Sequence, residues 1–216
     1  MCYYERMPEF LGLFLHLDET LGTAIAAYGG WIYVLLFVIV FCETGLVVTP
    51  FLPGDSLLFA AGAFAAAGAL NPFIIAGLLF AAAVLGDTVN YRIGRKIGTR
   101  AENGKLLGLP IKKEYIEKTK RYYEKYGSKT IVIARFMPIV RTFAPFVAGV
   151  GAMPYATFAR YNVFGAALWV GLFTFAGYFF GNIPVVKENF EIVILAIIFI
   201  SILPGVIEYL RERKKG

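Results

Sequence analysis

The chain has 216 residues, of which 58% are hydrophobic and 16% aromatic, and its mean hydropathy is +0.67. This composition excludes an ordinary soluble domain of this size and predicts an integral membrane protein. The net charge of +6 lies mostly in one loop and in the C-terminal tail, which membrane topology explains better than nucleic-acid binding does. With two cysteines and one histidine, His16, the sequence offers no disulfide framework, Cys-rich metal centre or histidine-pair phosphatase chemistry, so we expect no metal and no cofactor.

The chain divides into three predicted parts. In residues 1–30, acidic and apolar positions occur near helical spacing, which predicts an amphipathic helix at the membrane interface. Residues 31–210 form a single predicted membrane domain. Residues 211–216 are a basic tail, which we expect to be cytoplasmic.

Four stretches of the membrane domain approach the ~20 apolar residues that a bilayer crossing needs. They begin near residues 31, 71, 153 and 192 and end near residues 49, 91, 181 and 209. Two further apolar stretches, about residues 50–70 and 130–151, are interrupted by prolines and glycines, and we predict that they form re-entrant hairpins. The predicted fold class is an all-α integral membrane protein with about four transmembrane helices and two oppositely oriented re-entrant helical hairpins.

The orientation follows from the basic residues. Residues 92–129 contain twelve basic and four acidic residues, so this loop is predicted to be cytoplasmic, with an amphipathic helix at about residues 111–127. The loop and the basic tail must be separated by an even number of crossings. Residues 130–151 therefore have to enter and return on the cytoplasmic side. If residues 50–70 enter from outside, the two halves form an inverted repeat, as in many secondary transporters.

Five charged residues lie inside or beside the apolar stretches, where each costs about 2.5–3.5 kcal/mol at a helix centre. They are Glu43, Asp55, Asp87, Arg135 and Arg141. One explanation is mutual pairing that locks the halves together. The other is a binding site, because arginine suits phosphate oxygens and a buried carboxylate beside it can exchange protons near neutral pH. Simpler roles are also open, such as helix capping by Asp55 or pairing of Asp87 with Arg92.

The motifs around these charges resemble those of the DedA family, also called the SNARE-associated or VTT-domain family. The resemblance covers roughly residues 30–181. Its motifs are Phe51-Leu52-Pro53-Gly54-Asp55-Ser56, Gly86-Asp87 with Tyr91-x-x-Gly94, and Ala134-Arg135-Phe-x-Pro138-x-x-Arg141-x-x-x-Pro145-x-x-Ala148-Gly149. It implies paired re-entrant hairpins and movement of polyprenyl phosphate, typically undecaprenyl phosphate, or of other phospholipids across the bilayer. Some members are associated with the proton motive force.

The resemblance carries the family's functional acids and arginines to Glu43, Asp55, Arg135 and Arg141. We expect Arg135 and Arg141 to bind the phosphate and Glu43 and Asp55 to exchange protons. Supporting positions are Asp87, Pro53, Gly54, Ser56, Pro138 and Pro145.

The leading hypothesis is a transporter of the cytoplasmic membrane, not an enzyme, with polyprenyl phosphate or phospholipid and protons as its partners and no nucleic acid. A homo-oligomer is possible. Three alternatives stay open: a lipid scramblase without proton coupling, a membrane lipid phosphatase, and a scaffold whose buried charges only pair.

Overall fold

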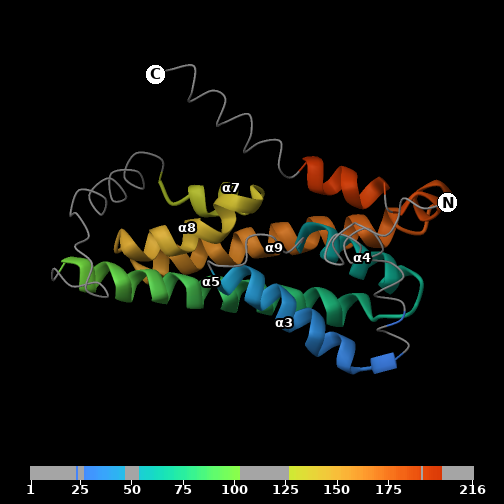
Figure 1. Cartoon of the computed structure of the whole chain (residues 1–216), viewed down its shortest axis with the longest axis horizontal. Helices are drawn as coiled ribbons and strands as arrows, with labels where there is room; N and C mark the ends of the chain where they lie inside the picture. Colours follow the sequence, from blue (N-terminus) through green and yellow to red (C-terminus); the bar gives the residue numbers. More distant parts are fainter. Residues whose placement is uncertain (1–22, 24–26, 47–53, 103–126, 191, 201–216) are drawn as a thin grey trace, which may run out of the picture.

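A computed structural model describes residues 23, 27–46, 54–102, 127–190 and 192–200 (Figure 1). Throughout these ranges the regular structure is helical and no strand occurs, which confirms the all-α class for them. The helices are α3 (Trp31–Gly45), α4 (Gly54–Ala66), α5 (Pro72–Glu102), α7 (Thr130–Ala134), α8 (Pro138–Val150), α9 (Tyr155–Phe180), α10 (Pro184–Glu188) and a helical stretch at residues 192–200.

Helices α5 and α9 form the long axis of the molecule and run in opposite directions beside each other (Figure 1). Both are long and apolar enough to cross a membrane, over Pro72–Gly98 in α5 and over all of α9. The start of α5 is fixed by Asn71, whose side-chain oxygen accepts hydrogen bonds from the amides of Phe73 and Ile74 at 3.0 and 3.1 Å. The restarts predicted at residues 71 and 153 therefore agree with the observed helix starts to within two residues.

The second predicted crossing ends too early, because α5 continues from residue 91 to Glu102. Arginine and lysine, which are common beyond residue 91, are good helix formers, so a gain in polarity alone does not end a helix. Gly94 and Gly98 also bring this extension against α8, where an added Cβ would meet the backbone of Phe146 and Val150. Packing against α8 thus explains why the helix extends into the basic region.

Helices α4 and α8 have 13 residues each, or about 20 Å of helix. Both begin near the middle of the long axis and run toward opposite ends (Figure 1). Helix α4 packs along α9 and α8 packs along α5, so each short helix covers the long helix of the other half of the sequence. The approach is close: a Cβ on Gly177 would clash with the backbone of Phe59, and one on Gly149 with that of Tyr91.

Much of what we predicted for the two broken stretches lies within the described residues. Residues 130–151 comprise α7, a turn at residues 135–137 and α8, which begins at Pro138, so the predicted break is present. In the first broken stretch, α4 and the turn that follows it are described, whereas residues 47–53 lie outside the described residues. The predicted helix at 111–127, except for its last residue, and the tail at 211–216 also lie outside them, as does most of the N-terminal segment 1–30.

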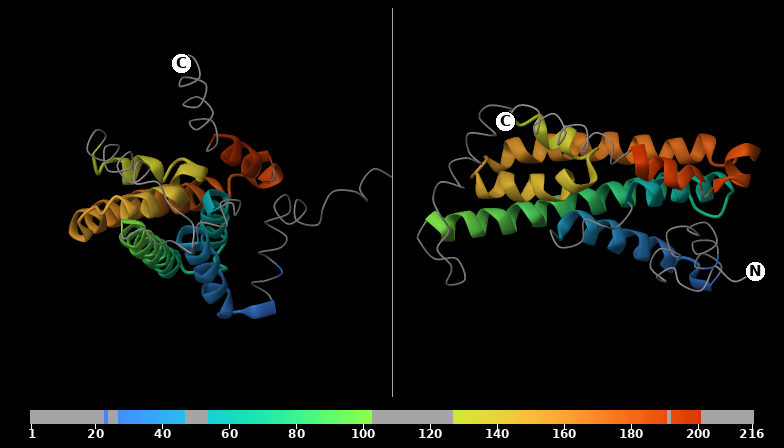
Figure 2. Two further views of the ribbon diagram at one scale, coloured as in Figure 1. Left: turned by 60° about the vertical axis from the view of Figure 1, so that its left-hand side comes forward. Right: turned by 45° about the horizontal axis from the view of Figure 1, so that its top comes forward.

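Helix α3 and residues 192–200 lie on opposite sides of the bundle (Figures 1 and 2). Helix α3 packs against α5 and buries Ile32, Leu36 and Val40 in the main apolar core. Many large apolar side chains instead point outward, including Phe73, Phe164, Phe179 and Phe199. An apolar exterior around buried charged groups is the arrangement expected of a membrane protein.

Candidate functional site

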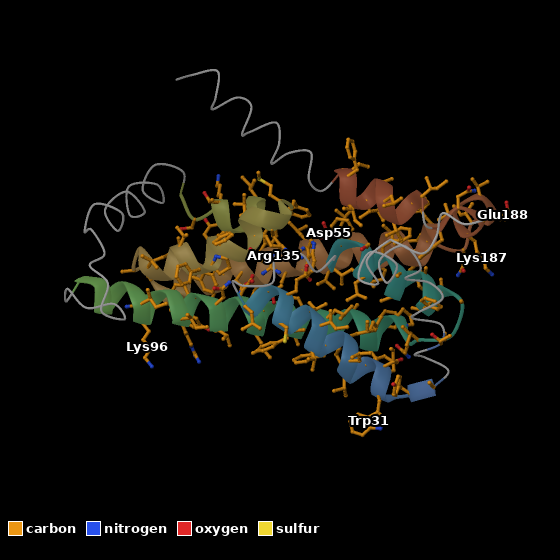
Figure 3. The ribbon with its side chains drawn as sticks, viewed as in Figure 1. Trp31, Asp55, Lys96, Arg135, Lys187 and Glu188 are labelled. Carbon is orange, nitrogen blue, oxygen red and sulfur yellow. The ribbon has the colours of Figure 1, made fainter. Side chains whose placement is uncertain are left out.

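The five charged residues singled out in the sequence are all buried. Their exposed fractions are 1% for Glu43, 6% for Asp55, 4% for Asp87, 3% for Arg135 and 6% for Arg141. Asp55 and Arg135 lie near the middle of the molecule, well away from Lys96 toward one end and from Lys187 and Glu188 at the other (Figure 3). The structure therefore brings these charges to the level at which α4 and α8 begin.

Arg141 joins three helices. It lies at the end of the first turn of α8, where its Nη1 donates a hydrogen bond to Asp55 Oδ1 of α4 at 2.9 Å. Its Nη2 donates to Glu43 Oε1 of α3. Asp55 and Arg141 are separated by 86 residues in sequence, so this hydrogen bond joins the two broken stretches.

Glu43 also binds the beginning of α4. Its Oε1 accepts a hydrogen bond from the backbone N–H of Gly54 at 2.9 Å. A Cβ at position 54 would clash with the Glu43 carboxylate, so glycine is required for this approach. Two buried atoms of the group, Glu43 Oε2 and Arg141 Nε, have no hydrogen-bond partner in the described part of the chain.

A second ion pair is formed by Arg135 and Asp87. Arg135, in the turn before α8, donates from Nη2 to Asp87 Oδ2 of α5 and to Asn162 Oδ1 of α9, the latter at 2.6 Å. The Asn162 amide in turn donates to the carbonyl of Val84 at 3.1 Å. The structure thus pairs Asp87 with Arg135 instead of the suggested Arg92, whose guanidinium lies 6.0 Å from the ring centre of Tyr155.

Trp169 of α9 connects the two ion-paired groups. Its Nε1–H donates to Asp55 Oδ1 at 2.7 Å. The Arg141 and Arg135 guanidinium carbons lie 4.6 and 5.8 Å from its ring centre, within the range of cation–π attraction. The Trp169 side chain thus lies beside both arginines and donates a hydrogen bond to Asp55 in the first turn of α4.

Asn90 links helices in the same central region. Its side-chain N–H groups donate to the carbonyls of Thr44 in α3 and Thr142 in α8, at 3.2 and 2.7 Å. The residue is fully buried on α5. Its amide therefore ties three helices together directly beside the charged residues.

The sequence reasoning missed Trp169, Asn162 and Asn90. The two asparagines carried a usable signal, since an uncharged polar side chain within a predicted crossing also needs a partner. Trp169 carried a weaker one: it lies in the middle of its crossing, whereas tryptophan usually gathers at membrane interfaces. The predictions concentrated on ionisable residues and so omitted all three.

The predicted supporting positions have different surroundings. Gly54 and Asp87 contact the charged groups directly, and Ser56 is buried in the first turn of α4. Pro138 begins α8 and Pro145 lies inside that helix, while Pro53 lies outside the described residues.

A cavity of about 350 Å³ lies elsewhere, at the C-terminal ends of α4 and α9, and is lined by Phe64, Lys187 and Phe190 among others. The charged groups themselves are enclosed.

Comparison with known proteins agrees with the motifs. The VTT domain profile matches residues 52–179. The chain is 56% identical over 205 residues to Protein DedA of Escherichia coli (strain K12), covering 93% of this chain and 92% of that protein. It is 42% identical over 173 residues to an uncharacterized membrane protein of Mycobacterium leprae (strain TN), covering 79% and 76%. It is 36% identical over 174 residues to Inner membrane protein YghB of E. coli (strain K12), covering 80% and 77%. No solved structure matches the chain significantly. On the domain match and on these identities, the chain is a membrane protein that belongs to the DedA family of VTT-domain proteins.

Proposed function

We propose that the protein transports an anionic lipid carrier, polyprenyl phosphate of the undecaprenyl type, across the cytoplasmic membrane together with protons. The observation that carries the proposal is Arg141, a buried guanidinium held between Glu43 and Asp55 where α3, α4 and α8 meet. The activity breaks no covalent bond, so the protein is not an enzyme in this account.

The topology follows from helix length. Helices α5 and α9 are long enough to cross a hydrocarbon core of about 30 Å, whereas α4 and α8, at about 20 Å, are too short. We infer that α4 and α8 each belong to a re-entrant hairpin. The first turns of these two helices meet at the bilayer midplane, and each helix runs from there back toward the membrane surface. Secondary transporters place their sites in this way, with the ends of broken helices directed at the substrate.

The orientation and location rest on charge and on a relative. The basic loop of residues 92–129 and the tail of residues 211–216 are proposed to be cytoplasmic. The relative YghB is an inner membrane protein, which supports the same membrane for this chain.

The ion pairs suggest how protons and phosphate are coupled. Arginine binds carboxylate and phosphate with the same planar fork, so the two anions compete for one guanidinium. Protonation of Glu43 or Asp55 weakens its hold on Arg141 and leaves the guanidinium available to a phosphate. Proton uptake and phosphate binding then favour each other, which is a coupling free energy between two sites.

Flux of polyprenyl phosphate in proteoliposomes tests this function. We expect Arg141→Ala and Glu43→Gln to abolish proton-dependent flux. The matched changes Arg160→Ala and Glu188→Gln, at exposed positions on α9 and α10, should leave it intact. Unchanged flux after Arg141→Ala would rule the mechanism out.

A lipid scramblase is the second candidate. It is favoured by the fact that all five buried charged residues are already ion-paired, so they can serve as a lock while lipids pass along the outside. Lipid flux that depends neither on a pH gradient nor on the identity of the lipid head group would identify this function.

A further inference from the structure

The carboxylate of Glu43 occupies a position built for an anion. Its Oε1 accepts from Arg141 Nη2 and from the backbone N–H of Gly54, the first residue of α4. The N-terminus of a 13-residue helix carries partial positive charge, and its amides are a common binding site for phosphate. An arginine and a helix N-terminus therefore converge on one oxygen of this carboxylate.

The carboxylate satisfies only part of that site. The Nε and Nη2 groups form one edge of a guanidinium, and a bidentate anion engages both. Here Arg141 Nη2 holds Glu43 Oε1, while the buried Nε has no partner among the described residues. Glu43 Oε2 is also buried and unpartnered. A buried polar atom without a hydrogen-bond partner is destabilising, so an anion that satisfies both Nη2 and Nε can replace this contact.

We propose that Glu43 occupies the position that the phosphate group of the lipid takes when it binds, so that ionised Glu43 and bound phosphate exclude each other. The inference rests on the proposed function and deepens it. The phosphate replaces the carboxylate at Gly54 N–H and Arg141 Nη2 and engages Arg141 Nε with a further oxygen. The chemical group that this site recognises is a phosphate, whether it belongs to a phosphate monoester or is free in solution.

The surrounding charges explain why a proton accompanies this exchange. Glu43 faces Arg141 from α8 and Asp55 from α4, and α5, packed against α3, brings Asp87 with its partner Arg135. Three carboxylates and two guanidinium groups carry a formal charge of −1 when all are ionised. An arriving phosphate is repelled by that excess charge in a medium of low dielectric constant. A proton taken from the aqueous phase by the displaced Glu43 brings the side chains to zero net charge.

Binding can be followed through Trp169, whose ring touches both arginines. Replacing the exposed Trp31 by Phe leaves Trp169 as the single tryptophan of the chain. This full-length protein, in micelles, is titrated with farnesyl phosphate between pH 5.5 and pH 8.5, with farnesol and inorganic phosphate as separate arms. The same titrations are made on Glu43→Gln and on the matched control Glu188→Gln.

We expect farnesyl phosphate to bind the Trp31→Phe protein more tightly as the pH falls, and farnesol not to show this trend. Glu43→Gln should bind at least about tenfold more tightly at high pH, because removing a competitor that fills the site more than nine-tenths of the time changes the apparent affinity by that factor. The affinity of Glu43→Gln should vary with pH only as far as the phosphate group of farnesyl phosphate itself titrates. Glu188→Gln should behave like the background. The same response with inorganic phosphate would support the site and assign recognition to the phosphate alone.

Two results would overturn the inference separately from the transport proposal. One is that Glu43→Gln and the Trp31→Phe background bind farnesyl phosphate with equal affinity at every pH, while the background protein still transports lipid phosphate with protons. The other uses unmutated protein: infrared difference spectra should show a carboxyl group becoming protonated when farnesyl phosphate binds, and absence of that band contradicts the exchange even if Glu43→Gln does not fold. No phosphate binding by any variant would overturn the inference and the proposed function together.

Discussion

The indole N–H of Trp169 donates a hydrogen bond to Asp55 Oδ1 across 2.7 Å, which ties the middle of α9 to the first turn of α4. The same Asp55 oxygen accepts from Arg141. Since the Trp169 ring also contacts both arginines, the two ion-paired groups share one neutral, polarisable neighbour. Trp169 can therefore transmit a change in one group to the other.

Trp169→Phe separates the two contributions of this residue. Phenylalanine keeps an aromatic face for the arginines but removes the donor to Asp55, a hydrogen bond to a charged group that contributes about 1.5–3 kcal/mol. We expect proton-dependent flux to fall by about tenfold or more, with its pH profile shifted. Trp169→Leu, which also removes the aromatic face, should be more severe. Equal flux and an identical pH profile for Trp169→Phe would exclude this role of the hydrogen bond.

The pair of Asp87 and Arg135 should show strong energetic coupling. Removing one partner leaves a buried, uncompensated charge, which typically costs about 3–5 kcal/mol. We expect Asp87→Ala and Arg135→Ala each to lower the free energy of unfolding in mixed micelles by this amount. The double variant should lose far less than the sum, as a double-mutant cycle measures. Additive losses would show that the ion pair contributes nothing specific.

The sequence predicted the components of the site better than their partners. Glu43, Asp55, Asp87, Arg135 and Arg141 stood out because charge is costly in apolar sequence, and all five are buried together. The choice of Asp87 for Arg135 depends on how α5, α9 and the turn before α8 pack, which residue types and spacing do not specify. The same holds for Trp169, whose role exists only once α9 brings its ring beside the two arginines.

Helix boundaries also divide into those that local sequence specifies and those that tertiary packing determines. Asn71 marks a helix start and Pro138 marks a break through local backbone chemistry, so the sequence located both features. The end of α5 depends on contact between Gly94 and α8, which is a tertiary effect and was missed. The roles predicted for the charged residues in binding phosphate and protons stay predictions.

The glycine contacts between α4 and α9 give a stability test with an internal control. Gly177→Ala places a Cβ against the backbone of Phe59, and overpacking of this kind costs about 1–3 kcal/mol. Gly171→Ala, on the same helix, meets nothing within 4 Å and should be neutral or stabilising, by up to about 1 kcal/mol. Thermal unfolding in detergent measures both. A similar midpoint for the two variants would argue against close packing of α4 on α9.

Asn90 should hold α3, α5 and α8 together. Asn90→Ala removes the donor to the carbonyls of Thr44 and Thr142, and loss of buried hydrogen bonds costs about 1–3 kcal/mol. Asn189→Ala provides the control, because this exposed residue donates its amide hydrogen bond to the carbonyl of Val185 one turn earlier. We expect Asn90→Ala to unfold at a lower denaturant concentration than Asn189→Ala, and coincident unfolding curves would refute the link.

The most direct test of coupled transport is uphill movement. Proteoliposomes are loaded with equal polyprenyl phosphate in both leaflets, and a pH gradient is then imposed with no other driving force. We expect the lipid phosphate to accumulate in one leaflet and the accumulation to reverse when the gradient is reversed. Arg141→Lys, which keeps the charge but loses the planar fork, should abolish the accumulation. A lipid distribution that stays equal under the gradient, in protein that still equilibrates lipid, would contradict proton-coupled transport.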